Sequence, residues 1–150
     1  IKMVIIAGCL IIKNEKILMV KEAKKQCYGQ WNCPAGHVEE KELITDAAIR
    51  EAYEETGCKV KLTGVLPIST VILKNGETAV MVRFTADVIE ENIKFDTKEI
   101  LDVKWLDLKD VKKMSNEQLR GYDTFFQELK DIEDKKIYPV DIFDSKKYIR

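Results

Sequence analysis

The strongest constraint on this chain is a group of acidic residues in one short segment with helical periodicity. Glu51, Glu54 and Glu55 are spaced i, i+3 and i+4, so at about 100° per residue they share one face of a helix. Like charges at this spacing repel each other, so helix stability gives no reason to keep them together. A divalent cation does, because Mg²⁺ takes oxygen ligands. The spacing therefore predicts a metal site on this helix.

The glutamates belong to a longer pattern with fixed spacing. Gly36 is followed after five residues by Glu42, which is followed after seven residues by the segment 50–57. A solvated acidic helix face is the ordinary explanation of clustered glutamates, but it does not account for the other fixed positions. The pattern resembles the Nudix box, GX5EX7REUXEEXGU, in which U is an aliphatic residue. Its fixed positions are all present: Gly36, Glu42, Arg50, Glu51, Glu54, Glu55 and Gly57.

The resemblance extends on both sides of the box, from about residue 4 to residue 111. Upstream, residues 29–39 are similar to the family's segment leading into the box. Downstream, residues 99–106 are similar to the strand that closes its active site. Three positions depart from the common pattern: Ala35 replaces a glycine, Lys41 stands where a turn glycine is usual, and Cys58 takes the last aliphatic position. Because Lys disfavours φ > 0, Lys41 is the departure that bears most on the local turn.

The resemblance implies a fold and an activity. The fold would be α/β, a Nudix α/β/α sandwich with a mixed sheet, in a single domain covering residues 1–150. The protein would be a hydrolase that uses Mg²⁺, or Mn²⁺ in its place. Its substrate would be a small-molecule nucleotide, with cleavage of a phosphoanhydride bond in a nucleoside di- or triphosphate or another nucleoside diphosphate derivative. Two other classes stay open as alternatives: a non-catalytic nucleotide sensor and a pyrophosphohydrolase that acts on RNA ends.

The resemblance also implies roles for the residues of the box. Glu54 and Glu55 are expected to bind the metal ion, and Glu51 to bind it or to activate water. The backbone carbonyl of Ala35 is a further expected ligand. Arg50 is expected to orient Glu51 and its neighbours through charge-assisted hydrogen bonds. The expected supporting residues are Gly36, Glu42 and Gly57.

One acidic residue outside the box is a candidate for the site. Glu99 lies six residues before Trp105, where some family members place a further ligand or base. Asp96 is its competitor. The alternative is a solvated acidic run, because residues 90–99 contain four acidic residues.

Four residues are candidates for substrate contact. Tyr28 lies in the predicted loop 21–29 and could stack on a ring. His37 follows the box glycine, where it could be a structural residue, a substrate contact or a general base. Arg83 lies on the polar side of an alternating strand, where it would face phosphate or solvent. Arg120 lies on a late predicted helix and could reach the substrate.

Composition limits the expected cellular compartment and the expected binding partners. The 25 basic and 26 acidic residues give a net charge of −1, so no DNA partner is expected, and RNA ends are disfavoured. The longest apolar run, residues 3–12, is too short to span a bilayer, so no membrane partner is expected. The four cysteines lack C-x-x-C spacing and the chain has one histidine. These features favour reduced, mostly buried thiols in a cytoplasmic protein.

Periodicity predicts the order of elements. Strands are expected at residues 3–12, 17–20, 31–34, 60–73, 79–89 and 100–106. Helices are expected at residues 43–56, 108–114 and 116–131, with Gly57 ending the first in a left-handed cap. Residues 135–150 leave two alternatives open, a docked tail or part of a homodimer contact.

Overall fold

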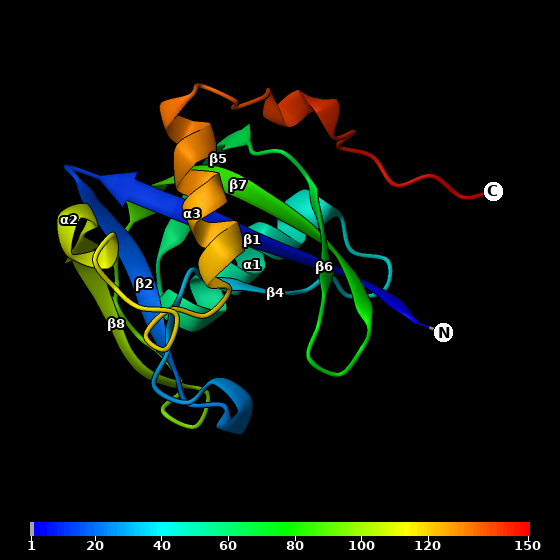
Figure 1. Ribbon diagram of the computed structural model, residues 1–150. Coiled ribbons are helices and arrows are strands. Elements are labelled where there is room, and N and C mark those ends of the chain that lie inside the picture. Colours follow the sequence, from blue (N-terminus) through cyan, green and yellow to red (C-terminus); the bar gives the residue numbers. More distant parts are fainter. Residues whose placement is uncertain (1) are drawn as a thin grey trace.

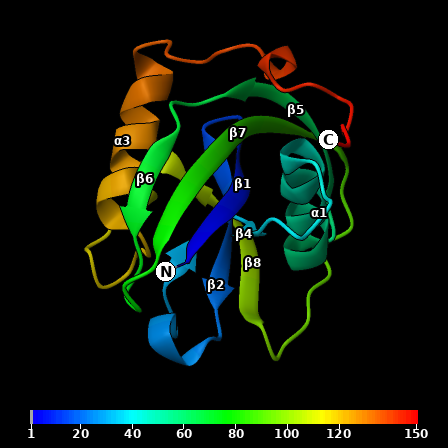
Figure 2. The same cartoon turned by 90° about the vertical axis from the view of Figure 1, so that its right-hand side faces the viewer.

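The computed structural model describes residues 2–150 and places eight strands in one sheet with helices on both faces (Figures 1 and 2). The strands are β1 (Met3–Lys13), β2 (Lys16–Glu22), β3 (Trp31–Asn32), β4 (Ala35–His37), β5 (Lys59–Val65), β6 (Ser69–Ile72), β7 (Thr78–Glu90) and β8 (Ile100–Asp107). The α-helices are α1 (Ile44–Thr56), α2 (Leu108–Val111) and α3 (Tyr122–Glu133), and the 3₁₀ turns are η1 (Lys25–Cys27) and η2 (Val140–Ile142).

The sheet is mixed, as the sequence predicts. Strands β1 and β7 form a parallel pair at its centre, in which residues 3–11 face residues 78–86. The other pairs of named strands are antiparallel: β2 and β4 pair with β1, β5 and β6 pair with β7, and β3 and β8 pair with β2. A parallel pair requires a long crossover connection, and here that connection carries β4 and α1. The crossover thus places the box directly beside the central strands.

Two apolar layers lie on opposite faces of the sheet, one under α1 and one under α3 (Figure 2). On the α1 side, Ala47, Ala48 and Ala52 are fully buried, and their small side chains allow the helix to approach the sheet closely. On the other side, Phe125 and Leu129 of α3 pack over a second layer of buried residues. These two layers confirm the predicted α/β class.

Several predicted elements have wrong boundaries: the helix expected at residues 108–114 ends at Val111, and the strand expected at residues 31–34 ends at Asn32. Two larger differences have a clear physical cause. The helix expected at residues 116–131 begins only at Tyr122, because Gly121 adopts a left-handed conformation with φ of 63°. The residues before it bond instead to Trp31, whose N–H donates to the Gln118 carbonyl (2.8 Å) and whose carbonyl accepts from Arg120 N–H (3.0 Å). The strand expected at residues 60–73 is broken around Pro67 into β5 and β6, because proline cannot donate to a ladder.

The C-terminal segment is docked on the sheet through its first half. Tyr138 and Val65 exchange two backbone hydrogen bonds of 2.8 Å each. The Phe143 ring then packs against Phe84, with ring centroids 5.4 Å apart. Figure 1 shows this segment crossing from the end of α3 over β5. Of the two alternatives for residues 135–150, the structure shows a docked tail, and the homodimer contact stays a prediction.

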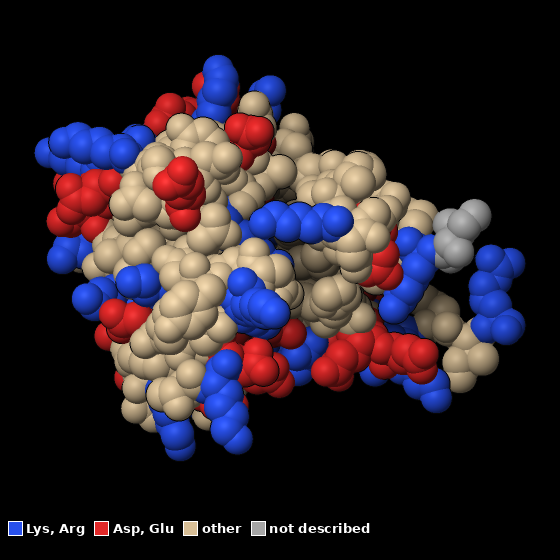
Figure 3. All heavy atoms as spheres, turned by 60° about the horizontal axis from the view of Figure 1, so that its bottom comes forward, with Lys and Arg blue, Asp and Glu red and all other residues tan. Residues whose placement is uncertain are grey.

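The surface carries both signs of charge. Lys and Arg side chains lie among Asp and Glu side chains over the face shown in Figure 3, and neither sign covers it as one area. None of the helices in residues 2–150 has the length and apolar composition that a membrane-spanning helix requires. All four cysteines are buried free thiols, as the sequence predicts.

Candidate active site

Helix α1 carries Glu51, Glu54 and Glu55 and has a defined C-terminal end. It ends at Gly57, which is left-handed with φ of 80° and donates its N–H to the Tyr53 carbonyl (2.8 Å). In the turn before the helix, Lys41 takes a φ of 63°, a conformation that favours glycine. The departure at position 41 is therefore accommodated by a lysine in the left-handed conformation.

A glycine allows the helix to approach strand β4. Gly36 pairs with Ala7 in the antiparallel β1–β4 ladder. A Cβ atom at position 36 would overlap the Glu51 carboxylate. The fixed glycine of the box thus has a steric reason, because only a residue without a side chain leaves room for Glu51 against this strand.

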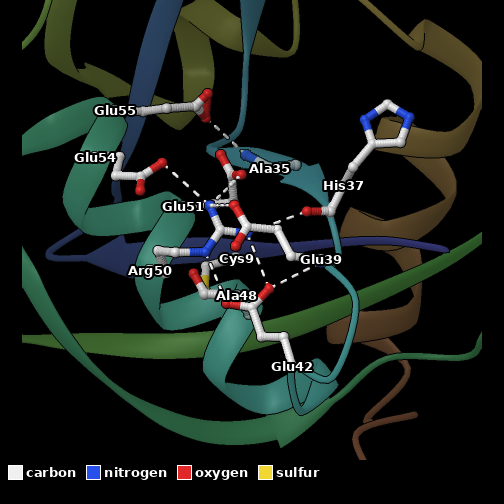
Figure 4. A network of polar contacts seen from close by, with 10 residues as sticks. All are labelled: Cys9, Ala35, His37, Glu39, Glu42, Ala48, Arg50, Glu51, Glu54 and Glu55. Carbon is white, nitrogen blue, oxygen red and sulfur yellow. Dashed lines mark hydrogen bonds and ion pairs between the residues drawn. The ribbon is translucent and has the colours of Figure 1, made fainter.

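Arg50 organises the carboxylates around it (Figure 4). Its Nε and Nη2 atoms donate to the two carboxylate oxygens of Glu42 at 2.7 and 3.0 Å. Its Nη1 atom donates to Glu51 Oε1 (2.8 Å) and Glu54 Oε2 (3.1 Å). Nη2 also donates to the His37 carbonyl (3.1 Å). A planar guanidinium with a fixed set of donors suits this arrangement, and its hydrogen bond lowers the pKa of Glu42.

Glu55 lies apart from this network and is the most deeply buried carboxylate of the box. Its Oε1 accepts a hydrogen bond from the Ala35 N–H (2.9 Å), and Figure 4 shows its side chain turned toward Ala35. Burial raises the Glu55 pKa to about 8, against the opposing effect of that hydrogen bond. Burial also raises the pKa of Glu51, although Arg50 opposes it. Two partly buried carboxylates of raised pKa thus face the same strand.

The carboxylate oxygens of Glu51, Glu54 and Glu55 are of the chemical type that a hard divalent cation binds. Within residues 2–150, no three His, Cys, Asp or Glu side chains converge closely enough to hold one ion. The reason is local: Arg50 bridges Glu51 and Glu54, while Glu55 bonds to a backbone amide. The Glu54 side chain is 56% exposed, so it can exchange its bond to Arg50 for a metal ion by a side-chain rotation. Carboxylate oxygens are the ligands that Mg²⁺ prefers.

The buried glutamates predict how stability depends on pH. In the unfolded chain Glu55 ionises near 4.5, whereas the folded carboxyl keeps its proton up to about pH 8. Between these values the folded state binds more protons, so the free energy of unfolding decreases as pH rises. In EDTA, we expect the Tm to fall by at least about 5 °C from pH 5 to 8, taking about 2–4 °C per kcal/mol.

Calorimetry on two proteins checks this expectation. The Tm of Glu55→Gln should fall much less from pH 5 to 8 than the Tm of the wild type. The fall that remains should come from Glu51, whose pKa is also raised. A wild-type Tm that stays constant from pH 5 to 8 would contradict the burial argument.

The structure does not bring the acidic residues of the 90–99 loop into the Arg50 network. Glu99 is exposed, and its backbone carbonyl accepts a hydrogen bond from Ala23 N–H (3.1 Å). The side chain of Asp96 accepts from the Lys98 N–H (2.9 Å). The Ala23 bond joins this loop to the end of β2. Whether either carboxylate completes the site stays a prediction.

Three of the candidate substrate contacts are at least partly exposed. Tyr28 is 66% exposed. The imidazole of His37 is also exposed, and Figure 4 shows its ring turned away from the Arg50 network. Arg120 is partly exposed and donates from Nη1 to Glu22 Oε2. Their contacts with substrate stay predictions.

The expectation for Arg83 is wrong. The side chain is buried and its Nε donates to Glu128 Oε2 of α3 at 2.9 Å. Strand alternation correctly puts Arg83 on the face opposite the β7 residues that pack under α1. That face is covered by α3, however, so the guanidinium meets a buried carboxylate and neither phosphate nor solvent.

Sequence reasoning missed one buried carboxylate beside the site. Glu22 ends β2 and is 2% exposed. The only signal in the sequence is an acidic residue two positions after an apolar strand segment, and such a residue is usually solvated.

Comparisons with known proteins agree with the motif. The sequence matches the NUDIX domain family over residues 3–126. It is 32% identical over 123 residues to a "Putative nudix hydrolase 1" of Caenorhabditis elegans, covering 79% of this chain and 32% of that protein. It is 36% identical over 109 residues to the "8-oxo-dGDP phosphatase NUDT18" of Danio rerio, covering 69% of this chain and 32% of that protein. The chain spans about a third of the length of these curated relatives.

Solved structures show the same fold. A NUDIX hydrolase from Nitrosomonas europaea superimposes with a TM-score of 0.87 at 27% identity, covering 98% of both chains. A MutT NUDIX hydrolase from Burkholderia pseudomallei superimposes with a TM-score of 0.73 at 21% identity, covering 85% of this chain and 98% of that chain. The motif, the site geometry, the family match and the fold agree, and the chain belongs to the Nudix hydrolase family.

Proposed function

We propose that this chain is a divalent-metal-dependent hydrolase that cleaves a phosphoanhydride bond in a nucleoside di- or triphosphate or another nucleoside diphosphate derivative. The observation that carries the proposal is the arrangement of Glu51, Glu54 and Glu55 on α1, with Arg50 bound to the first two and the Ala35 N–H bound to the third. Divalent metal ions are general in this family, and Mg²⁺ is the proposed cofactor here, with Mn²⁺ as a substitute.

Different residues would bind the cation and take the proton from water. Glu54 and Glu55, with the Ala35 carbonyl, would hold the cation, which when bound neutralises phosphate charge. Arg50 binds Glu51 Oε1, so Oε2 is the atom that would take a proton from the attacking water. A raised pKa makes the Glu51 carboxylate a stronger base for that step. Glu99 is proposed as a further ligand or base, and kinetics of Glu99→Gln beside Asp96→Asn would decide between these two acids.

The substrate class is the least constrained part of the proposal. Tyr28 and Arg120 are proposed to contact the nucleotide, together with His37, because all three are at least partly exposed. The relative from Danio rerio is named for 8-oxo-dGDP, so purine nucleoside diphosphates and their oxidised forms come first in a substrate screen. Nucleotide sugars and nucleoside triphosphates complete the panel.

The test of the function is metal-dependent turnover. We expect phosphate-containing products from at least one nucleotide of the panel with Mg²⁺ or Mn²⁺, and loss of turnover after EDTA, because hard oxygen ligands bind these ions. Chromatography of the products shows which bond is cleaved. Full turnover after exhaustive chelation would contradict the central claim.

The same screen separates the alternative classes. A nucleotide sensor would bind a nucleotide, as seen by calorimetry, without turning it over. An RNA-end hydrolase would release phosphate or diphosphate from a 5′-triphosphorylated oligonucleotide in preference to free nucleotides.

Two further proposals concern the protein as a whole. A cytoplasmic location is supported by the buried free thiols, because disulfides are rare in that compartment. The second proposal is that this chain forms a homodimer. Light scattering at several concentrations tests it, and a constant monomer mass would reject it.

A further inference from the structure

Arg120 is oriented by one buried partner and keeps most of its donors free. Its Nη1 atom donates to Glu22 Oε2. The Glu22 side chain is 2% exposed, whereas the Arg120 side chain is 39% exposed. Nη1 is the only guanidinium atom of Arg120 that bonds to another of residues 2–150. A guanidinium is a planar fork of N–H donors, so the pair fixes this fork and leaves Nε and Nη2 available to a ligand.

The backbone around Arg120 is fixed as well. Its N–H donates to the Trp31 carbonyl (3.0 Å), and the Trp31 N–H donates to the Gln118 carbonyl (2.8 Å). Figure 1 shows this loop, between α2 and α3, beside the end of β2. Within residues 2–150, Glu22 forms its one ion pair with Arg120, and separating a buried carboxylate from its cation is costly. The guanidinium is therefore a rigid donor.

The same glutamate holds an exposed aromatic ring. Tyr28 is 66% exposed, and both of its neighbours in the chain bond to Glu22. The Cys27 thiol donates to Glu22 Oε2 (3.7 Å), and the Gly29 N–H donates to the Glu22 carbonyl (2.8 Å). An exposed aromatic ring is a stacking surface for the face of a base. One buried residue thus places a donor fork and an aromatic ring at the end of β2.

A short stretch of chain joins this pair to the glutamates of the box. Its first residue is Trp31, which bonds to the Arg120 backbone. Its last is Ala35, whose N–H donates to Glu55 Oε1 (2.9 Å). The two are four positions apart, and such a stretch spans at most about 14 Å. Since a nucleotide carries its base and its phosphates on opposite sides of the ribose, a substrate with its phosphates at α1 can bring its base to Arg120.

The charge of the pair favours a neutral acceptor over phosphate. Glu22 and Arg120 carry opposite charges in direct contact, so their fields largely cancel at the distance of a ligand. Directional hydrogen bonding from the fork remains. Guanine presents two neighbouring acceptors, O6 and N7, that match an arginine fork, whereas adenine carries the N6 amino group, a donor, in place of O6. A fixed and neutralised arginine therefore discriminates between the two purines.

We propose that Arg120 is a specificity-determining residue that donates to O6 and N7 of a guanine base, with Glu22 as its positioning residue and Tyr28 stacked on the base. The inference rests on the proposed function, because it needs a nucleotide whose phosphates lie at the box. It narrows the substrate class to guanine nucleotides.

Steady-state kinetics with GDP and ADP at a fixed Mg²⁺ concentration is the test. In wild type, kcat/KM for GDP should exceed that for ADP by about 5- to 150-fold, the range for a bidentate arginine–guanine contact. Glu22→Leu/Arg120→Met leaves no buried unpaired charge and no donor fork. In this variant the two values should agree within about twofold, because KM for GDP rises while kcat changes little. Equal values in wild type, or an unchanged ratio in the variant, would overturn the inference.

The Arg83–Glu128 pair provides a matched control. Both of its side chains are less than 10% exposed, so this arginine is closed to a ligand. Arg83→Met/Glu128→Leu should keep the ratio of the two kcat/KM values within about twofold of wild type, as for a site without contact to the base. Loss of the ratio in both double variants would show a general effect of altered packing and would refute the role of Arg120.

Tyr28→Ala separates stacking from base discrimination. Stacking accepts every base and its loss typically weakens binding about 5- to 150-fold. We therefore expect KM to rise by a similar factor for GDP and ADP, with their ratio preserved. Unchanged KM values for both nucleotides would reject the stacking role.

Inorganic diphosphate separates base recognition from phosphate binding. If Arg120 bound phosphate, Glu22→Leu/Arg120→Met would weaken inhibition by diphosphate and would affect GDP and ADP equally, which overturns the inference. Calorimetric binding of GDP and ADP identifies which proposal fails. If GDP binds more tightly than ADP without being cleaved, the hydrolase proposal fails and the base preference stands. If both are cleaved with equal kcat/KM, the inference fails alone, and it also fails if neither nucleotide binds.

Discussion

Replacing Glu55 by Gln is expected to lower turnover at least about a hundredfold, a typical scale for a lost electrostatic contribution at a reacting centre. The substitution replaces one carboxyl oxygen by an amide nitrogen, which cannot bind a cation, but it keeps the shape of the side chain. The Ala35 N–H can still donate to the remaining oxygen, so the contact at 2.9 Å survives. The neutral side chain also no longer suffers the desolvation that raises the Glu55 pKa. The fold should therefore be retained while activity is lost.

Steady-state kinetics with a fixed Mg²⁺ concentration and a Tm measurement on the same preparation check this expectation. Glu54→Gln is expected to lose activity on the same scale, since it too is proposed to bind the metal. Glu133→Gln is a suitable control, because that residue lies on α3 in an exposed pair with Lys112. Near-normal turnover in Glu55→Gln with Mg²⁺ bound would count against its role as a ligand.

Removing Arg83 is expected to have the largest effect on stability. Arg83→Met leaves Glu128 buried and charged without its partner, which typically costs about 3–5 kcal/mol. For a chain of this size the Tm should fall by roughly 6–20 °C. Both side chains of the pair are less than 10% exposed, so water cannot replace the lost hydrogen bond without opening the layer under α3.

A double variant tests whether the loss comes from the unpaired charge. Arg83→Met/Glu128→Leu replaces the pair by apolar groups of similar size, and such replacements are often neutral or stabilising. Thermal and denaturant unfolding should show that the double variant recovers most of the stability lost in Arg83→Met. Equal instability of both variants would instead point to a packing requirement for the guanidinium.

The sequence predicts the site to the extent that its geometry is local. Glu51, Glu54 and Glu55 share a face because helical periodicity is a property of neighbouring residues. The left-handed cap at Gly57 is equally local, and the structure has it. The mixed sheet follows from one long crossover between strands. These features could be predicted without knowing which residues pack against them.

The features that the sequence did not predict depend on distant partners. Alternation placed Arg83 on one face of its strand, but it could not show that α3 covers that face. The helix expected from residue 116 starts at Tyr122 because the preceding turn bonds to Trp31, some ninety positions away along the chain. Glu22 was overlooked because its burial results from Arg120 and from the loop after β2. The pattern of neighbouring residues does not show which distant residues will contact each other.

The central β1–β7 pair has a consequence for biosynthesis. Its ladder joins residues 3–11 to residues 78–86, and β4 attaches to the same β1 strand. A nascent chain that has just completed α1 therefore contains every glutamate of the box, but it lacks β7, the strand that pairs with β1 along residues 3–11. Contacts of such large sequence separation form late and slowly. We expect the catalytic geometry to arise only after β7 leaves the ribosome, so shorter translation products would carry the whole motif and remain inactive.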